Sequence, residues 1–317
     1  MAVASTQMSH EDESECVHDR WLVLNPTSGT ATHVDRVRSL AAERGYRIEQ
    51  TEGPGHAVEL AEAAVEADAD LVAAAGGDGT LNEVLRGLDA ADGLDDVTLG
   101  VVPTGTENLF ATNIDVTGIE RAFAVLDTGE RRRIDIGVAG ETPFVMSCVA
   151  GLTAEASIAT SSELKERFGS LAFAITGVQQ AADFDGLHID VSAVSKGEET
   201  RWAGEALGAL VGNVRRFAKQ GGQANVEDGL FEVVVIEQMP TSKAVAEAAA
   251  HRVFARDTEH VHRFQASQLT VDALDGEPIN FSIDGEPHRD DHLVLHTRPK
   301  ALQVCVGPDY EADPTDE

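Results

Sequence analysis

The first third of the chain alternates between two hydrophobic patterns. Short apolar or alternating segments at 20–25, 46–52, 70–75 and 97–102 are typical of β-strands. Between them, apolar residues recur every three or four positions at 32–45, 56–69, 80–88 and 118–129, as in amphipathic helices. Strands that alternate with helices predict a parallel sheet with helices on both of its faces.

The rhythm changes after residue 133. Segments 134–140 and 142–151 resemble the two strands of a hairpin, and a mainly helical stretch follows at 154–182. Short strand-like segments then recur at 187–195, 205–213, 229–237, 262–274, 278–285, 292–297 and 301–307, with one helix expected at 241–255. Many short strands separated by turn residues predict a β-rich, antiparallel, sandwich-like second domain.

These patterns divide the chain into four parts. We expect a disordered acidic extension at 1–19, an α/β domain at 20–133, a β-rich domain at 134–307, and an acidic tail at 308–317 that frays. The first residues lack the basic start and apolar core of a signal peptide. Since no run of 18 apolar residues occurs, we expect no transmembrane segment and a cytoplasmic protein, peripheral at the membrane at most.

Composition adds a strong charge imbalance. The 317 residues include 24 basic and 55 acidic side chains, a net charge of −31, and only five of the basic residues are lysines. Either this is simply a very soluble acidic protein, or it is adapted to a salty cytoplasm, where self-repulsion is screened; the scarcity of lysine favours adaptation. Nucleic acid is an improbable partner, because the only tight basic cluster, Arg131–Arg133, is more typical of a solvated corner.

The three cysteines, Cys16, Cys148 and Cys305, lie far apart in the sequence. Their odd number and wide spacing predict neither a disulfide framework nor a zinc site, which fits a reducing cytoplasm. The histidine groups His251, His260, His262 and His288, His292, His296 lack a metal-binding spacing, so we assign no transition metal.

Candidate chemistry begins at Gly76, Gly77 and Gly79, between a buried strand and a helix. A glycine-rich turn at this position lets a phosphate approach the backbone and the free N–H groups of the helix start. We expect Thr80 to cap that helix and Glu83 to complete a capping box. A tight turn with a good cap would need the same residues, and the sequence matches neither the P-loop nor the full dinucleotide fingerprint.

Asp78 favours a ligand site over a simple capped turn. A carboxylate beside a phosphate site is unfavourable unless a cation or a hydroxyl group lies between them, so Asp78 suggests Mg²⁺ or a hydrogen bond to a nucleotide or substrate. Two further loops, 25–29 (NPTSG) and 103–111 (PTGTENLFA), also follow predicted parallel strands. All three loops are therefore expected to converge on one crevice.

The motifs NPTSG, GGDGTLNEVLRGL and PTGTENLFA, in this order, resemble the diacylglycerol kinase catalytic domain family, which includes bacterial lipid kinases and sphingosine kinases and is distantly related to the NAD kinases. The likeness extends over about residues 20–306. It continues in GLTAE at 151–155, in the Asp-Gly-Leu segment at 228–230 and in Asp-Gly-Glu at 284–286.

The resemblance implies an ATP-dependent lipid kinase that uses Mg²⁺ and meets its lipid substrate at the membrane surface. It implies nucleotide contacts by Asn25, Pro26, Thr27, Ser28, Gly29, Thr51, Gly76, Gly77, Asp78, Gly79, Thr80, Leu81, Asn82, Glu83 and Thr106. It makes Glu286 the general base, with Asp78 as a second catalytic residue. It also implies a Mg²⁺ site at Asp228 with the carbonyl groups of Asn225 and Leu230.

Three positions depart from the family pattern. Glu107 and Leu109 replace the Gly and Asp that often flank Asn108, and Thr153 replaces an Asp. These positions bear on the acceptor. The resemblance implies that the α/β domain at 20–133 binds the nucleotide and that the β-rich domain at 134–307 binds a diacylglycerol-like lipid. If the charge reflects a halophilic archaeal host, an ether-linked diol is an equal alternative. Two alternatives remain open: an NAD kinase, and a non-catalytic nucleotide-binding regulator. The protein is also a possible homodimer.

Overall fold

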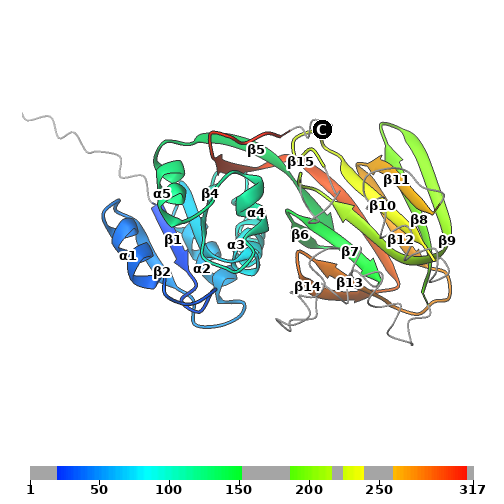
Figure 1. Ribbon diagram of the computed structural model, residues 1–317, viewed down its shortest axis with the longest axis horizontal. Helices are drawn as coiled ribbons and strands as arrows, with labels where there is room; N and C mark the ends of the chain where they lie inside the picture. The colour runs from blue at the N-terminus through cyan, green and yellow to red at the C-terminus, as the bar shows by residue number, and fades with distance from the viewer. Residues whose placement is uncertain (1–19, 152–185, 216–223, 239–259, 313–317) are drawn as a thin grey trace, which may run out of the picture.

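The computed structural model describes residues 20–151, 186–215, 224–238 and 260–312. The helices expected at 154–182 and 241–255, and the extension at 1–19, lie outside these residues. The described part has a helix-containing domain and a β-rich domain, which lie side by side along the long axis of the molecule (Figure 1).

The first domain is built on a four-stranded parallel sheet in the order β2-β1-β3-β4. Its strands are β1 (Arg20–Leu24), β2 (Arg47–Gln50), β3 (Leu71–Gly76) and β4 (Thr98–Pro103). All six residues of β3 and of β4 are buried, because helices cover both faces of the sheet. This part of the predicted fold class is confirmed.

The helices of this domain form two pairs. α1 (Val34–Ala42) packs beside α5 (Ile119–Thr128) on one face, and α2 (His56–Glu66) packs beside α3 (Asp78–Ala90) on the other (Figure 1). A short helix, α4 (Leu109–Asn113), forms inside the segment that we expected to be a loop. Leu22, Leu85 and Phe123, each fully buried, represent the core between the sheet and its helices.

The second domain is antiparallel and β-rich, as predicted. Its strands are β6 (Thr142–Phe144), β7 (Ser147–Gly151), β8 (Leu187–Ser195), β9 (Glu198–Gly212), β10 (Phe231–Glu237), β11 (Val261–Ala266), β12 (Gln268–Ala273), β13 (Ile279–Ile283) and β14 (Glu286–Asp290). Its own core includes Phe144 and Phe231, whose stacked rings lie 5.6 Å apart, and Phe281.

Two long strands join the domains. β5 (Glu130–Ala139) and β15 (His292–Val306) pair with each other, and both run from one domain into the other (Figure 1). β15 pairs with β12 of the second domain near its start and in parallel with β4 of the first near its end, so the described strands form one continuous sheet. The boundary that we expect at residue 133 therefore falls inside β5, and it stays a prediction.

One local expectation was wrong. The segments 292–297 and 301–307 are one strand, β15, with a register shift between Arg298 and Leu302.

The described start of the C-terminal tail contacts both domains. The Tyr310 hydroxyl lies 3.1 Å from Glu227, and the Asp309 amide donates to Asp115 at 2.9 Å. The fraying expected for the tail stays a prediction.

Candidate active site

The three glycine-rich loops meet at the carboxyl edge of the parallel sheet. The amide of Asn25, just after β1, donates to the carbonyl of Ala75 in β3 at 2.8 Å. The amide of Thr104, just after β4, donates to the carbonyl of Gly76 at 2.9 Å. Asn25 also donates through Nδ2 to Thr80 Oγ1 at 2.9 Å, so the first loop is tied to the start of α3.

The loop at 25–29 is held in a compact turn. Asn25 Oδ1 accepts hydrogen bonds from both the amide and the hydroxyl of Thr27 at 3.0 Å, a local pattern that asparagine side chains commonly form in turns. Ser28 Oγ lies 2.6 Å from Thr104 Oγ1. Gly29 has φ +54°, and a Cβ there would lie 2.3 Å from the carbonyl oxygen of Thr104, so this position needs glycine.

The other two loops touch through glycines. A Cβ on Gly105 would lie 2.5 Å from the Cα of Gly77, closer than any side chain tolerates. Gly79 is different: it is exposed, and a Cβ there would have no neighbour within 4 Å. Gly105 therefore permits close packing of two loops, whereas Gly79 leaves backbone open toward the outside of the site.

The start of α3 offers the donors of an anion site. The helix begins at Asp78 with Gly77 as its N-cap residue, and no side chain caps it. The first N–H groups of a helix have no partner within it and lie at the positive end of the helix dipole. Backbone amides at Asp78 and Gly79 are thus placed where a phosphate can reach them.

The expected capping box does not form. Thr80 lies inside the first turn of α3 rather than before it, and its hydroxyl accepts the bond from Asn25. The Glu83 carboxylate instead accepts from the amides of Gly55 at 2.9 Å and Ala57 at 3.2 Å, at the start of α2. Glu83 therefore caps the neighbouring helix, which fixes the position of α2 against α3.

Asp78 has partners that the sequence did not suggest. Its two carboxylate oxygens accept hydrogen bonds from the amides of Leu109 at 3.0 Å and Phe110 at 3.1 Å, the first residues of α4. Asn108 folds the preceding loop by bonding both the amide and the carbonyl of Gly105. Asp78 thus ties the loop after β4 to the loop after β3, and a direct role toward Mg²⁺ stays a prediction.

The remaining predicted nucleotide contacts occupy the same edge of the sheet. Thr51, directly after β2, is buried and donates its amide to the carbonyl of Leu24 at 2.9 Å. Thr106 is exposed at the tip of the loop after β4, and Pro26 lies in the turn after β1. Leu81 and Asn82 are buried in the first turns of α3.

The Asp-Gly-Glu segment forms the turn between β13 and β14. Asp284 and Gly285 have φ values of +47° and +94°, as a two-residue hairpin turn requires, and Glu286 follows as the exposed first residue of β14. The Asp284 carboxylate is buried and accepts hydrogen bonds from the amides of Val145 at 2.8 Å, Met146 at 2.9 Å and Ser147 at 2.8 Å.

The same carboxylate reaches the first domain. Asn82 Nδ2 lies 3.4 Å from Asp284 Oδ2, so the hairpin that carries Glu286 contacts the helix that carries the glycine-rich loop. Burial raises the pKa of Asp284 to about 6, although its backbone partners lower it. Sequence analysis named the motif of Asp284 but gave its side chain no role, because Asp-Gly is common in hairpin turns and the partners of this side chain are distant in sequence.

The predicted metal residues form a tight turn against β5 and β15. Asn225 Oδ1 accepts from the amide of Glu227, and Asp228 Oδ1 accepts from that of Leu230, both at 2.9 Å. Buried Asp135 holds this turn: its carboxylate accepts from the amides of Gly229 at 2.6 Å and Lys300 at 2.7 Å, and burial raises its pKa.

A Mg²⁺ ion fits the chemistry of this turn. Its donors are one carboxylate and backbone carbonyl groups, and Mg²⁺ takes oxygen ligands, often only one or two of them carboxylates, while it keeps several waters. Within the described residues, no three His, Cys, Asp or Glu side chains are arranged to hold a metal. Most of the coordination sphere would therefore be carbonyl oxygen and water.

Comparisons with known proteins match both parts of the chain. Residues 19–139 match the diacylglycerol kinase catalytic domain, and residues 146–306 match the YegS C-terminal NAD kinase beta sandwich-like domain. The chain is 28% identical over 297 residues to the lipid kinase YegS of Escherichia coli K12, covering 91% of this chain and 96% of the relative. It is also 28% identical over 276 residues to the diacylglycerol kinase of Bacillus subtilis 168, covering 84% and 88%.

Solved structures share the fold. A putative diacylglycerol kinase from Bacillus anthracis str. Sterne superposes with a TM-score of 0.77 at 18% identity, covering 93% of this chain and 97% of the other. A second structure described in the same words has a TM-score of 0.76 at 18% identity, covering 93% and 99%. Among the residues that the structure describes, no helix has the length and hydropathy needed to cross a membrane.

Fold and family matches together define a protein in which a glycine-rich parallel-sheet domain is joined to a β-rich domain. The chain belongs to the diacylglycerol kinase catalytic domain family, and its second domain is the NAD kinase-like β-sandwich of the YegS proteins.

Proposed function

We propose that this protein is an ATP-dependent lipid kinase, which transfers the γ-phosphate of ATP to the hydroxyl group of a diacylglycerol-like lipid or an ether-lipid diol. One observation carries the proposal: the hairpin of Glu286 is docked through Asp284 on Asn82, in the helix that follows the glycine-rich loop. The names of the relatives, lipid kinase and diacylglycerol kinase, support the same class of acceptor.

The chain supplies two parts of the reaction. The loops at 25–29, 76–80 and 104–108 bind the triphosphate through backbone amides, with Gly79 leaving room for close approach. Glu286 accepts the proton of the lipid hydroxyl while the hydroxyl oxygen forms a bond to the γ-phosphorus of ATP. The bond between that phosphorus and the bridging oxygen breaks, and ADP leaves with this oxygen.

Magnesium completes the charge balance. When bound, Mg²⁺ neutralises the negative charge of the phosphates while that charge shifts among their oxygens during transfer. The turn with Asp228 and the carbonyls of Asn225 and Leu230 would hold a structural Mg²⁺ ion, and its position against β5 and β15 would stiffen the junction of the domains.

The acidic surface constrains how the lipid is reached. A net charge of −31 repels anionic headgroups, so docking at a membrane depends on apolar contact or on salt that screens the repulsion. We therefore expect activity at a membrane surface in molar salt, and a neutral lipid alcohol as the preferred acceptor.

The test is a radiolabelled ATP assay against a total lipid extract in molar salt, with NAD assayed in parallel. Glu286→Gln should lose turnover by about 10²–10⁴-fold while it keeps ATP affinity, because only the base is removed. Glu277→Gln, an exposed glutamate on the preceding connection, is the matched control and should keep wild-type turnover.

Each other outcome rejects the proposal in a distinct way. A labelled product that migrates with NADP would identify an NAD kinase. ATP binding without any labelled product, unchanged in Glu286→Gln, would identify a nucleotide-binding regulator.

A further inference from the structure

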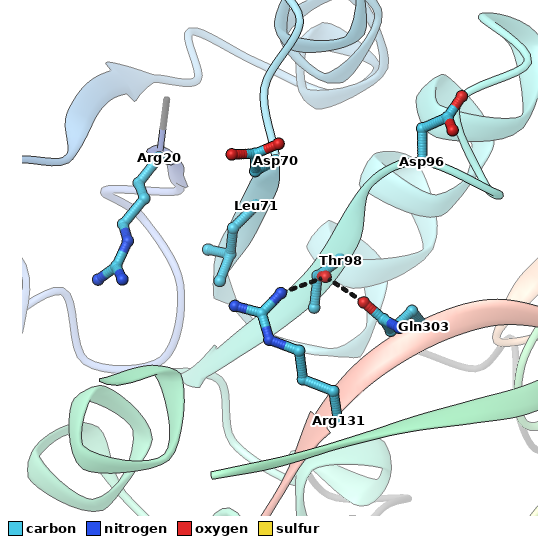
Figure 2. A pocket seen from close by; sticks show the side chains of 7 residues that line it. All are labelled: Arg20, Asp70, Leu71, Asp96, Thr98, Arg131 and Gln303. Atoms are coloured by element: carbon cyan, nitrogen blue, oxygen red, sulfur yellow. Dashed lines mark hydrogen bonds between the residues drawn. The ribbon is translucent and has the colours of Figure 1, made fainter. Parts of the chain in front are cut away.

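A hollow lies at the amino-terminal edge of the parallel sheet, opposite the glycine-rich loops. Its volume is about 300 Å³, and it is lined by Arg20, Asp70, Leu71, Asp96, Thr98, Arg131 and Gln303 (Figure 2). Arg20, Leu71 and Thr98 are the first residues of β1, β3 and β4. Since a strand of six residues spans about 17 Å, the length of β3 separates this hollow from the glycine-rich loops.

The floor of the hollow fixes one arginine. Thr98 is almost fully buried, and its hydroxyl accepts a hydrogen bond from Arg131 Nη1 at 2.6 Å and donates to Gln303 Oε1 at 2.7 Å. An arginine has five N–H donors, and this bond uses one of them. The Arg131 guanidinium is thereby oriented by a neutral group and keeps its charge for another partner.

This pairing is unusual within the arginine cluster. Arg132 forms ion pairs with Glu227 and Glu130, and Arg133 pairs with Asp95. In the part of the chain that the structure describes, no carboxylate lies within ion-pair distance of Arg131. In a protein with 55 acidic residues, an oriented arginine with no such partner among the described residues favours an anion from outside the chain.

A second guanidinium faces the same space. Figure 2 shows Arg20 and Arg131 on two sides of the space next to Leu71. Arg20 has a long contact with Asp127, 3.5 Å between Nη1 and Oδ1, and its guanidinium lies 5.8 Å from the centroid of the Tyr46 ring; 29% of its side chain is exposed. Two guanidinium groups that approach one space favour a tetrahedral oxyanion, because their planar donor forks match phosphate oxygens.

The rim of the hollow limits the charge and the polar groups that the rest of the ligand can have. Asp96 is exposed at the mouth of the hollow, so it repels additional negative charge and accepts hydrogen bonds from hydroxyl groups. The volume is at the lower end of small-molecule sites and exceeds what one phosphate fills. We infer that this hollow binds the phosphate group of a small polyol phosphate monoester, at a site separate from the kinase centre.

The test uses the full chain, with a non-hydrolysable ATP analogue in excess so that the glycine-rich loops are occupied. Inorganic phosphate and glycerol 3-phosphate are titrated separately by calorimetry. Both should saturate one site per chain, and glycerol 3-phosphate should bind more tightly because the Asp96 carboxylate accepts a hydrogen bond from its hydroxyl groups. Saturable binding of neither probe would overturn the inference.

Variants locate the site. Arg131→Gln and Arg20→Gln should each weaken both probes at least tenfold, whereas Arg36→Gln, which removes an exposed charge paired with Glu120, should not. Asp96→Asn should raise the affinity for inorganic phosphate, because it removes a repelling charge. It should lower the affinity for glycerol 3-phosphate, because it removes an acceptor for the hydroxyl groups. If Arg131→Gln and Arg20→Gln bound both probes within twofold of the wild-type affinity, the anion would bind elsewhere. If either variant fails to fold, Asp96→Asn still tests the inference.

Discussion

Asn82 and Asp284 lie 202 residues apart in the chain, yet Asn82 Nδ2 contacts Asp284 Oδ2 at 3.4 Å across the junction of the two domains. The contact is a long, weak hydrogen bond, but its acceptor is held rigidly by three backbone amides of 145–147. Glu286 follows Asp284 by two residues, so the buried carboxylate sets where the proposed base stands relative to the phosphate loops.

Asp284 should make stability depend on pH in an unusual direction. Burial raises its pKa from 3.8 to about 6, so the folded protein binds this proton more tightly than the unfolded chain does. Its contribution to stability is therefore fully present below about pH 4 and is lost as the pH rises through 6. Relative to Asp284→Asn, wild type should lose up to about 3 kcal/mol of unfolding free energy between pH 4 and 7.

Denaturant unfolding of both proteins at several pH values measures this effect. Asp291→Asn, which removes an exposed carboxylate beyond the same hairpin, is the matched control. Parallel stability curves for wild type and Asp284→Asn would contradict the assignment of the titration to Asp284.

Two glycines of the phosphate loops should respond differently to alanine. Gly79→Ala adds a methyl group to open space, so it should leave stability nearly unchanged while it weakens ATP-analogue binding at least tenfold. Gly105→Ala should reduce both the stability and the affinity for the ATP analogue, because its Cβ would lie 2.5 Å from the Cα of Gly77 and force the two loops apart.

Calorimetric titration and thermal unfolding separate the two effects. Gly204→Ala, in β9 and in ordinary contact with Trp202, controls for the substitution itself. If Gly79→Ala bound the analogue as wild type does, the phosphate would not approach the backbone at this turn.

Glu83 should matter for stability through α2 rather than through its own helix. Glu83→Ala leaves the amides of Gly55 and Ala57 without their carboxylate, which should lower the free energy of unfolding by about 1–2 kcal/mol. Glu59→Ala, an exposed glutamate on α2, should change it little. Equal losses in the two variants, measured by denaturant unfolding, would show that the cap is unimportant.

Local pattern was enough to predict most of the first domain. Strands such as 70–75 and helices such as 118–129 follow from periodicity, because each buries a face that its own residues define. The start of α3 was misplaced by two residues because Thr80 and Glu83 match a capping box locally, whereas Glu83 bonds to a neighbouring helix. Tertiary contacts overrode the local signal.

Long-range pairing explains the other differences. The strand β15 resembled two strands because Pro299 and Lys300 interrupt its pattern, and only its ladder with β5 shows that it continues past them. Asp284 and Arg131 owe their surroundings to residues far away in sequence. Neither a buried hairpin aspartate nor an arginine on a buried threonine has a signature in one sequence.

Removal of magnesium should reveal whether the turn at 225–230 binds the ion. Mg²⁺ bound only to the folded state raises the midpoint of thermal unfolding, by an amount that grows with its concentration above the dissociation constant. When the Mg²⁺ concentration is a hundred times the dissociation constant, binding raises the free energy of unfolding by about 2.7 kcal/mol. Wild type should therefore unfold at lower temperature after EDTA treatment and recover when MgCl₂ is added at constant ionic strength.

The variant Asp228→Asn should abolish this recovery, because it removes the only carboxylate assigned to the ion. It retains an oxygen that can accept from the amide of Leu230, so the turn itself should persist. Asp275→Asn provides the control: this exposed aspartate makes the same kind of turn contact, to the amide of Glu277, far from the proposed ligands in sequence. A Mg²⁺ response of Asp228→Asn equal to that of wild type would remove the ion from this turn and leave the ATP phosphates and Asp78 as its expected ligands.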